Sequence, residues 1–258
     1  MNTLTIDIGN NKIKLDYWAD EGIITHSVEE TLSLEDVKRK VESYDIKGII
    51  LSSVRKNYED IFLNLKDNCN CIIVDFDSRE IERHSKKIRY NGMVGADRIA
   101  AFLGAKALKS GPKLIIDAGT AITLDIEDKD GNYCGGNISL GFRTRLNALA
   151  QATSLLPKVE KFECSSFFGS DTLSAIQDGA RNGVTGEMLY TLDLARQEYQ
   201  IEWVVMTGGD SKRFFQSLSN KWEKSLYDDF LVGRGLNYHL RKFYFPEAFQ
   251  HTNFQQSI

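Results

Sequence analysis

Short apolar runs alternate with amphipathic segments along most of this chain. A run at residues 4–8 is followed by a second at 13–18, and a similar pair occupies 114–116 and 122–126. Apolar runs of this length predict β-strands, and each pair predicts a hairpin. The segment 97–109 instead repeats its apolar residues with a helical period. Strands that alternate with helices favour an α/β architecture over a sandwich or a bundle.

The same patterns predict further elements. Strands are expected at 46–52, 71–76 and 203–206, and helices at 58–65, 145–153, from 211 and at 236–243. A long helical pattern at 172–199 contains Gly179, Gly183 and Gly186, so it predicts either two helices or one kinked helix. The polar tail after Pro246 is a candidate for disorder.

A Ser110-Gly111-Pro112 break ends the helical pattern at 97–109 and divides the chain into predicted halves, 1–111 and 112–258.

Each half contains an Asp-x-Gly phrase at a strand-to-strand turn: Asp7-Ile8-Gly9-Asn10 and Asp117-Ala118-Gly119-Thr120. Glycine lets the backbone approach an anion closely, and a neighbouring carboxylate suits a metal ion. One isolated copy would be explained as a tight turn. Two copies indicate related half-domains that face one nucleotide.

Composition narrows the classes of partner. The 258 residues include 32 Lys and Arg against 36 Asp and Glu, so the net charge is 32 − 36 = −4, which disfavours nucleic acid as the main partner. No apolar run approaches the roughly 20 residues of a membrane span, and the N-terminus enters a strand without a secretory leader. We therefore expect no membrane partner and a cytoplasmic location. The four cysteines lack the usual zinc spacings and are expected to be reduced structural thiols.

Thr207-Gly208-Gly209-Asp210 follows the strand predicted at 203–206. Ligands of α/β sheets bind outside the carboxyl ends of strands, and paired glycines let a flat ring lie against the backbone. The alternative is a plain strand-to-helix turn with Asp210 as the N-cap.

Gly95-Ala96-Asp97-Arg98 opens the helix predicted at 97–109. In one interpretation, Asp97 only complements the positive end of the helix dipole and Arg98 is solvated. In the other, Asp97 is the general base for a hydroxyl nucleophile, and Arg98 is a fork-shaped clamp for a substrate carboxylate. Spacing alone does not decide between them.

Together these phrases resemble the acetate kinase, sugar kinase, Hsp70 and actin superfamily. The series Asp7-x-Gly9-Asn10-x-x-x-Lys14, Gly95-x-Asp97-Arg98 and Asp117-x-Gly119-Thr120-Ala121 resembles type III pantothenate kinase more narrowly. The glycine-rich stretch at 135–141, the phrase Gly169-Ser170-Asp171-Thr172 and Asn182-Gly183 are similar to that family as well. The resemblance extends from about residue 3 to about residue 243.

The resemblance implies two ribonuclease H-like (actin-like ATPase) half-domains with a nucleotide cleft between them. It implies ATP-dependent phosphorylation of pantothenate to 4'-phosphopantothenate, the first step of coenzyme A biosynthesis. It also implies a homodimer that requires Mg²⁺ and a monovalent cation, K⁺ or NH₄⁺. Two alternatives stay open: a non-catalytic nucleotide-binding accessory or regulatory relative, and another small-molecule kinase of the superfamily.

Residue roles follow from the same resemblance. Asp7 would hold Mg²⁺ through water, Asp117 would hold the monovalent cation, and Asp97 would be the catalytic base. The ATP and phosphate contacts would be Asp7, Ile8, Gly9, Asn10, Asn11, Lys12, Ile13, Lys14, Thr120, Gly208 and Gly209. The pantothenate contacts would be Tyr90, Gly95, Ala96, Asp97, Arg98 and Thr172, with Thr172 reaching the substrate of the partner subunit.

The sequence departs from the family pattern at three places. Asn11 stands where the family usually has Thr or Ser, and Leu140 replaces a proline. The segment before Gly95 is shorter than usual and lacks its proline, which makes Tyr90 the weakest of the substrate assignments.

Overall fold

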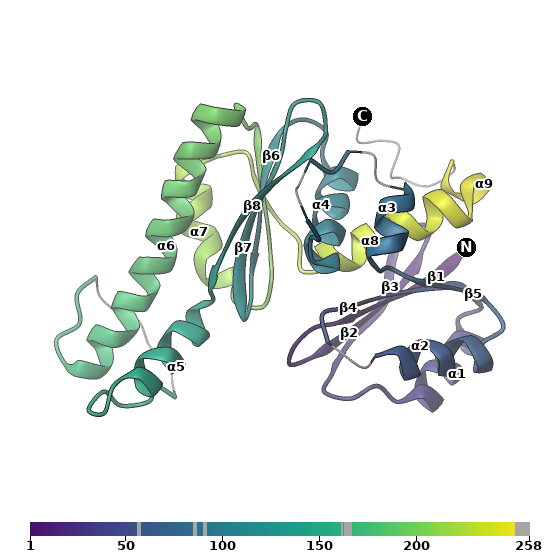
Figure 1. The fold of residues 1–258 in the computed structure, drawn as a ribbon, viewed down its shortest axis with the longest axis horizontal. Helices are drawn as coiled ribbons and strands as arrows, with labels where there is room; N and C mark the ends of the chain where they lie inside the picture. The colour runs from purple at the N-terminus through teal and green to yellow at the C-terminus, as the bar shows by residue number, and fades with distance from the viewer. Residues whose placement is uncertain (56–57, 85–86, 90–91, 161, 163–166, 251–258) are drawn as a thin grey trace. The chain divides into compact units, whose positions relative to one another are not determined.

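The structure is a computed structural model that describes residues 1–258 except 56–57, 85–86, 90–91, 161, 163–166 and 251–258. It divides into two compact units (Figure 1). The first contains Met1–Ser110 together with the chain from Phe230 onward, and the second is Gly111–Asp229. Each unit has one five-stranded sheet.

The sheet of the first unit has the strand order β3-β2-β1-β4-β5. Strands β1 (Asn2–Ile8), β2 (Ile13–Ala19) and β3 (Gly22–Glu29) form an antiparallel meander, and β4 (Ile46–Ser53) and β5 (Ile72–Asp75) continue parallel to β1. The helices of this unit are α1 (Leu34–Ser43), α2 (Glu59–Asn68), α3 (Ser78–His84), α4 (Ala96–Leu108), α8 (Leu231–Tyr244) and α9 (Pro246–Phe249).

Helices cover both faces of this sheet. Alternate β1 residues (Leu4, Ile6 and Ile8) pack with Val37 of α1 and Leu65 of α2 in a buried cluster. On the opposite face α8 contacts β1, β2 and β4, and it also packs against α4. Because both faces are covered, β1 and β4 are almost continuously buried, including the polar residues Thr3 and Thr5 of β1.

The second unit repeats this topology. Its sheet has the order β10-β9-β6-β7-β8, with β6 (Lys113–Ala118), β7 (Ala121–Glu127) and β8 (Tyr133–Leu140) antiparallel, and β9 (Trp203–Thr207) and β10 (Ser225–Tyr227) parallel to β6. The corresponding pairs are β1 and β6, β2 and β7, β3 and β8, β4 and β9, and β5 and β10. The sheet topology thus confirms the predicted α/β fold of two related halves.

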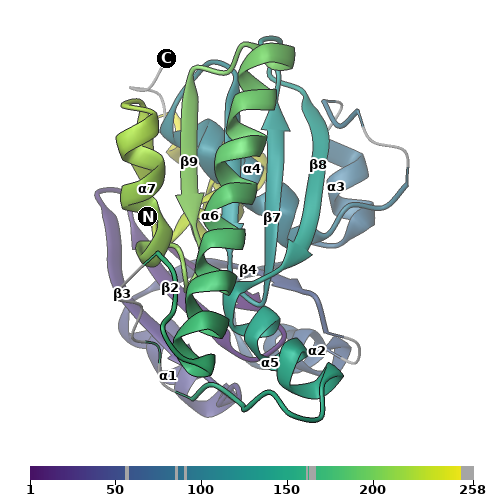
Figure 2. The same ribbon diagram turned by 90° about the vertical axis from the view of Figure 1, so that its left-hand side faces the viewer.

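Three helices complete the second unit: α5 (Phe142–Ala152), α6 (Thr172–Tyr199) and α7 (Lys212–Lys221). Helices α6 and α7 lie along one face of the sheet (Figure 2). Their buried residues, among them Val184, Met188 and Phe214, pack onto Ile116, Leu124 and Met206 of the strands.

The division of the chain differs from the predicted halves at its C-terminal end. Residues from Phe230 onward were expected in the second half, but they belong to the first unit. The reason is the close packing of α8 on α4. A Cβ atom on Gly235 would lie 1.8 Å from the backbone oxygen of Ala100, and one on Gly104 would lie 2.1 Å from that of Leu231. Glycine at both positions lets the two backbones touch.

Several other expectations were wrong in detail. The pattern at 172–199 forms one continuous helix, α6. Helix α8 begins at Leu231 rather than at 236, and the short helix α9 lies in the predicted tail. Within the described residues, no helix is long and apolar enough to cross a membrane.

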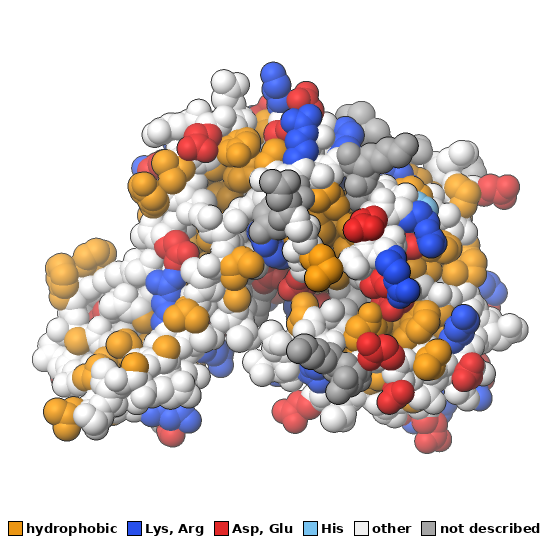
Figure 3. All heavy atoms as spheres, in the orientation of Figure 1, with side chains coloured by type: hydrophobic (Ala, Val, Ile, Leu, Met, Phe, Trp, Pro, Cys, Tyr) orange, Lys and Arg blue, Asp and Glu red, His pale blue; other side chains and the backbone are white. Residues whose placement is uncertain are grey.

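Large apolar side chains are exposed on the second unit. Leu155 and Phe168 are 92% and 82% exposed, and Phe167 and Tyr190 are also largely exposed. Hydrophobic side chains gather over the region of α5 and the first turns of α6 (Figure 3). Such a patch on a folded domain marks a candidate interaction surface.

Candidate functional site

The loop between β1 and β2, residues 9–12, forms the first candidate site. The Gly9 amide donates to the Lys12 carbonyl over 3.0 Å, which closes the loop and leaves Asn10 and Asn11 exposed. Asp7 lies one residue before the end of β1 and is partly buried. It pairs in register with Lys14 on β2 and with Ser52 on β4. The structure therefore brings Asp7, the loop and Lys14 together, as predicted from their order in the sequence.

The end of β4 holds this loop in place. The Val54 amide donates to the Ile8 carbonyl at 3.1 Å, and Nε of Arg55 donates to the Gly9 carbonyl at 2.6 Å. Ser53 Oγ accepts from the Arg55 amide at 3.0 Å and fixes the turn.

Ser52 and Arg55 were not predicted as site residues. In-register residues of neighbouring strands project to the same face, so Ser52 lies beside Asp7. Ser52 is fully buried, and its Oγ has no hydrogen-bond partner among the described residues. The parallel pairing of β4 with β1 brings both residues to the loop, and no sequence motif signals it.

The phrase Gly95-Ala96-Asp97-Arg98 forms the start of α4, with Gly95 as the N-cap and Ala96 as the first helical residue. Asp97 is partly exposed, and its Oδ1 accepts from the Arg98 amide at 2.8 Å. A Cβ atom on Gly95 would lie 2.5 Å from that Oδ1, so the carboxylate folds back over the glycine. Arg98 is only 6% exposed, which contradicts the interpretation of a solvated arginine. Tyr90 lies outside the described residues.

The loop between β6 and β7 is tighter than its counterpart. Asp7 pairs with Lys14, a spacing of 14 − 7 = 7, whereas Asp117 pairs with Thr123, a spacing of 123 − 117 = 6. The start of α5 fixes this loop, because the Gly141 amide and Thr144 Oγ1 both donate to the Thr120 carbonyl, at 3.0 and 2.6 Å. A Cβ atom on Gly141 would lie 1.9 Å from the Gly119 oxygen. Thr120 itself stays exposed.

Asp117 lies against the turn that follows β9. Gly208 has a φ of +103°, and a Cβ atom there would lie 2.4 Å from Asp117 Oδ1. The Asp210 amide donates to the Ala118 carbonyl at 2.9 Å, which joins the ends of β6 and β9. Around Gly209 a Cβ atom would meet nothing within 4 Å, so this glycine presents an open backbone surface.

Asp210 does not cap the helix that follows. The N-cap of α7 is Ser211, so the alternative of Asp210 as the N-cap was wrong. The carboxylate of Asp210 is nearly buried and accepts from Nε of Arg143 at 3.1 Å.

Thr172 is the first residue of α6 and is exposed. Asp171 before it is the N-cap, accepting from the Leu173 and Ser174 amides at 2.9 and 3.0 Å. Ser174 Oγ completes a capping box by accepting from the Asp171 amide at 3.1 Å. The phrase at 169–172 therefore has a clear structural role, and it leaves the Thr172 side chain in solvent.

Comparisons with known proteins identify the family. A family model described as type III pantothenate kinase matches residues 3–193. The type III pantothenate kinase of Phocaeicola vulgatus is 33% identical over 244 residues, 91% of this chain and 96% of the relative. That of Flavobacterium johnsoniae is 31% identical over 222 residues, 84% of this chain and 89% of the relative. The chain belongs to the type III pantothenate kinase family.

A solved structure supports the fold of this pantothenate kinase relative. The activator of the 2-hydroxyisocaproyl-CoA dehydratase from Clostridium difficile, with bound ADPNP, has a TM-score of 0.53 and 14% identity, covering 100% of this chain and 98% of that one. At this identity the likeness concerns the fold alone, which is the actin-like ATPase fold with two five-stranded sheets.

The donor set fits the divalent ion that a kinase of this family uses with ATP. Mg²⁺ keeps most of its waters and is bound through one or two carboxylates rather than an all-protein cage. Among the described residues no cluster of three or more His, Cys, Asp or Glu could hold a metal. A single carboxylate, Asp7, beside the orphaned Oγ of Ser52 matches a hydrated ion.

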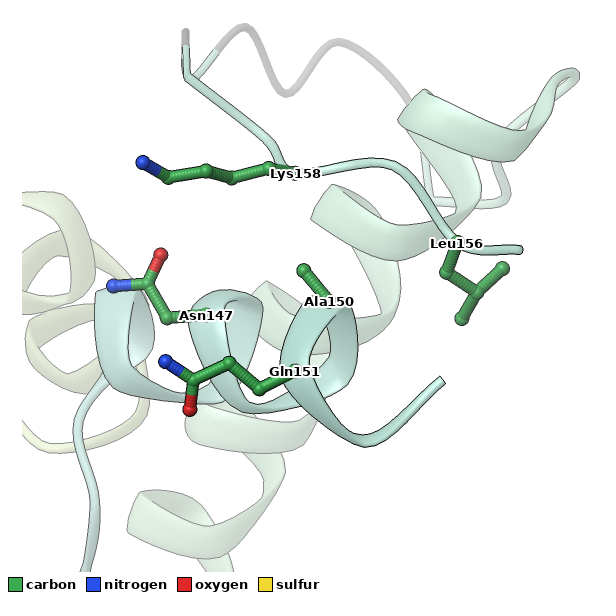
Figure 4. Close-up of a pocket in the computed structure, with 5 residues that line it drawn as sticks. All are labelled: Asn147, Ala150, Gln151, Leu156 and Lys158. Atoms are coloured by element: carbon green, nitrogen blue, oxygen red, sulfur yellow. The ribbon is translucent and has the colours of Figure 1, made fainter. Parts of the chain in front are cut away.

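A surface pocket in the second unit contains none of the predicted pantothenate kinase residues. It has a volume of about 440 Å³ and lies between α5 and the segment that follows it (Figure 4). Its lining residues are Asn147, Ala150, Gln151, Leu156 and Lys158. The polar ends of Asn147 and Lys158 face the same space.

Proposed function

We propose that this protein transfers the γ-phosphoryl group of ATP to the primary hydroxyl of pantothenate and forms 4'-phosphopantothenate, the first step of coenzyme A biosynthesis. Membership of the type III pantothenate kinase family, over residues 3–193, is the observation that carries this function. The duplicated sheets support it, because each places an aspartate one residue before the end of its first strand, Asp7 on β1 and Asp117 on β6.

Phosphoryl transfer depends mainly on positioning and on neutralising charge. Asp97, partly exposed at the start of α4, accepts the proton of the pantothenate hydroxyl as it attacks phosphorus. Arg98 binds the pantothenate carboxylate through its planar fork of donors, and Gly95 and Ala96 border the same substrate. Asp7 would hold Mg²⁺ through water, and the ion would supply positive charge to the phosphates. The loop at 9–12 with Ile8, Ile13 and Lys14 borders the same phosphates in this proposal.

The second loop completes ATP binding in this proposal. Thr120 is exposed and its backbone is fixed by α5, and in this proposal its side chain contacts the nucleotide. The adenosine lies against the backbone at Gly208 and Gly209 in this proposal, and the space around Gly209 is open. Asp117, packed against Gly208, would hold a monovalent cation, K⁺ or NH₄⁺, through its carboxylate together with carbonyl oxygens.

We also propose that the protein is a cytoplasmic homodimer in which Thr172 reaches the pantothenate of the partner subunit. Gly179, Gly183 and Gly186 recur on an exposed face of α6, where each costs about 1 kcal/mol of helix stability relative to alanine. Close packing of the partner subunit's backbone against this face would explain why glycine stands at these positions despite that cost. The exposed apolar side chains of the same unit, such as Phe168 and Tyr190, supply area for the contact.

The test is coupled ADP release with and without pantothenate, in K⁺ and in Na⁺ buffer. We expect ADP release that depends on pantothenate and is faster in K⁺. Nucleotide binding without pantothenate turnover would instead identify an accessory protein, and equal rates in both buffers would contradict the monovalent-cation site.

The Asp97→Asn variant tests the catalytic base. It should fold normally and lose roughly 10²- to 10⁴-fold in pantothenate-dependent turnover, because the amide cannot accept the proton. Asp67→Asn, an exposed position in α2, is the matched control and should leave the rate unchanged. Near-normal turnover by Asp97→Asn would exclude Asp97 as the base.

A further inference from the structure

Arg55 lies directly beside the loop at 9–12. Its Nε donates to the Gly9 carbonyl over 2.6 Å, and the side chain is partly buried. The backbone of Arg55 is held on both sides by Ser53, whose Oγ accepts from the Arg55 amide at 3.0 Å and donates to the Arg55 carbonyl at 3.2 Å. A guanidinium has five N–H donors in a rigid fork, and the contact with Gly9 uses only one of them. The fork is thus fixed at the loop with donors to spare.

The contacts of Arg55 differ from those of other arginines in this unit. Arg39, Arg79 and Arg241 each pair with an aspartate. In the described part of the chain, no carboxylate lies within ion-pair distance of Arg55. A partly buried cation that is anchored through a carbonyl and lacks an anionic partner in the protein is suited to an anionic ligand.

One donor of the loop is already used within the protein. The Gly9 amide is bonded to the Lys12 carbonyl, and the side chains of Asn10 and Asn11 are neutral amides. None of the motifs by which the chain resembles its family includes residue 55.

We propose that Arg55 binds phosphate oxygens of the nucleoside triphosphate held at the loop of residues 9–12, which rests on the proposed function. The guanidinium supplies charge-assisted, bidentate hydrogen bonds that the loop backbone and Asn11 do not supply. The contact with Gly9 orients the fork before the nucleotide arrives. Arg55 thereby contributes to the affinity for the phosphate chain and not to the affinity for the nucleoside.

Two substitutions separate this role from a structural one. Arg55→Gln keeps an N–H that can donate to the Gly9 carbonyl but removes the charge, and Arg55→Lys keeps the charge but loses the fork. The measurement is equilibrium titration of the full-length protein with MgATP and with adenosine, together with the thermal midpoint. We expect Arg55→Gln to weaken MgATP binding about 10- to 100-fold, and adenosine binding and the midpoint to stay unchanged. Arg55→Lys should give an intermediate loss for MgATP.

Arg79→Gln is the matched control, because Arg79 is 84% exposed on α3 and should not affect nucleotide affinity. Unchanged MgATP affinity in Arg55→Gln would overturn the proposal. An equal loss for MgATP and adenosine, with a lower thermal midpoint, would show that Arg55 only supports the loop and would overturn it too.

The binding test is independent of pantothenate. A wild-type protein that binds MgATP but does not phosphorylate pantothenate would refute the proposed function, while the Arg55 comparison would still be decided by affinity. A wild-type protein that binds neither MgATP nor adenosine would refute both the proposed function and the role of Arg55.

Discussion

Asp7 and Asp117 occupy equivalent positions in the two sheets, yet their neighbours differ. Asp7 lies beside the buried hydroxyl of Ser52 and opposite Lys14 across the hairpin. Asp117 lies against the Gly208 backbone, at a turn that is one residue shorter. The first loop is one residue longer, whereas at the second loop the Asp117 carboxylate and the Ala118 carbonyl surround the same point at Gly208. The residue environments therefore favour unequal roles for the two aspartates.

His239 gives a prediction about pH. It is buried on α8, and its Nε2 lies 2.8 Å from Glu80 Oε1. Burial lowers the pKa of His239, against the opposing effect of Glu80. The native protein therefore keeps His239 neutral at pH values where the unfolded chain, with a pKa of about 6.5, is protonated. The unfolded state then binds more protons, so stability falls as the pH decreases below about 6.5.

The measurement is the thermal midpoint between about pH 8 and pH 5, for the wild type and for His239→Gln. Several titratable groups, Glu80, Arg83, His84, Lys242 and Tyr244, surround this histidine, so the difference between the two proteins is the informative quantity. The loss of stability toward acid should be smaller in His239→Gln than in the wild type. Parallel curves for the wild type and His239→Gln would contradict the prediction.

At the scale of the element, the crossing of α4 and α8 ties the end of the chain to the first unit. Gly235→Ala should lower the free energy of unfolding by about 1–3 kcal/mol, because the new methyl group would overlap the Ala100 carbonyl and force the helices apart. Chemical denaturation measures the change. Gly209→Ala, where a Cβ atom meets nothing within 4 Å, is the control and should have little effect. A Gly235→Ala variant as stable as the wild type would show that the crossing adjusts freely.

The sequence predicted most elements that contain a clear apolar run, and it missed helices α1 and α3 and strands β3, β8 and β10. Strand β3 alternates exposed and partly buried residues and has no apolar run, and β8 exposes Asn137, Ile138 and Leu140 after its glycines. Helix α6 stays continuous because its glycines lie on the exposed face, while Ile176, Ala180 and Val184 recur on the buried one. The hydrophobic pattern of a single segment does not reveal the tertiary contacts that stabilise it.

The same limit applies to the candidate site. Sequence motifs located Asp7, Asp97 and Asp117 at strand or helix ends. This was possible because an apolar run next to Asp and Gly predicts, from neighbouring residues alone, where a strand or helix ends or begins. Ser52 and Arg55 carry no motif, and they join the loop at 9–12 only because β4 pairs in register with β1. The placement of residues from Phe230 onward was unpredictable for a similar reason, since the Gly104 and Gly235 contact joins segments far apart in the chain.

At the scale of the whole molecule, the duplication is incomplete. Between β3 and β4 the first unit has only the ten-residue helix α1, whereas between β8 and β9 the second has α5 and the 28-residue helix α6. The N-terminal part of α6 extends beyond its sheet (Figures 1 and 2). The exposed apolar residues Leu155, Phe167 and Phe168 belong to this added region. The part of the fold that has no counterpart in the other half is therefore the best candidate for contact with a second copy.

Substitutions on α6 test the homodimer directly. Around Gly179 and Gly186 a Cβ atom would meet nothing within 4 Å, so leucine at either position should leave the protomer folded, and leucine has the higher helix propensity. The same side chains would prevent close approach of a partner backbone, so Gly179→Leu and Gly186→Leu should sediment as monomers where the wild type sediments as a dimer.

Because Thr172 is proposed to reach the partner's substrate, both variants should also show a raised KM for pantothenate while MgATP affinity is retained. Ser217→Leu, on the exposed face of α7, is the control for an added leucine and should remain dimeric. A wild type that is monomeric at micromolar concentration, or leucine variants that remain dimeric, would place the active form of this kinase in a different assembly.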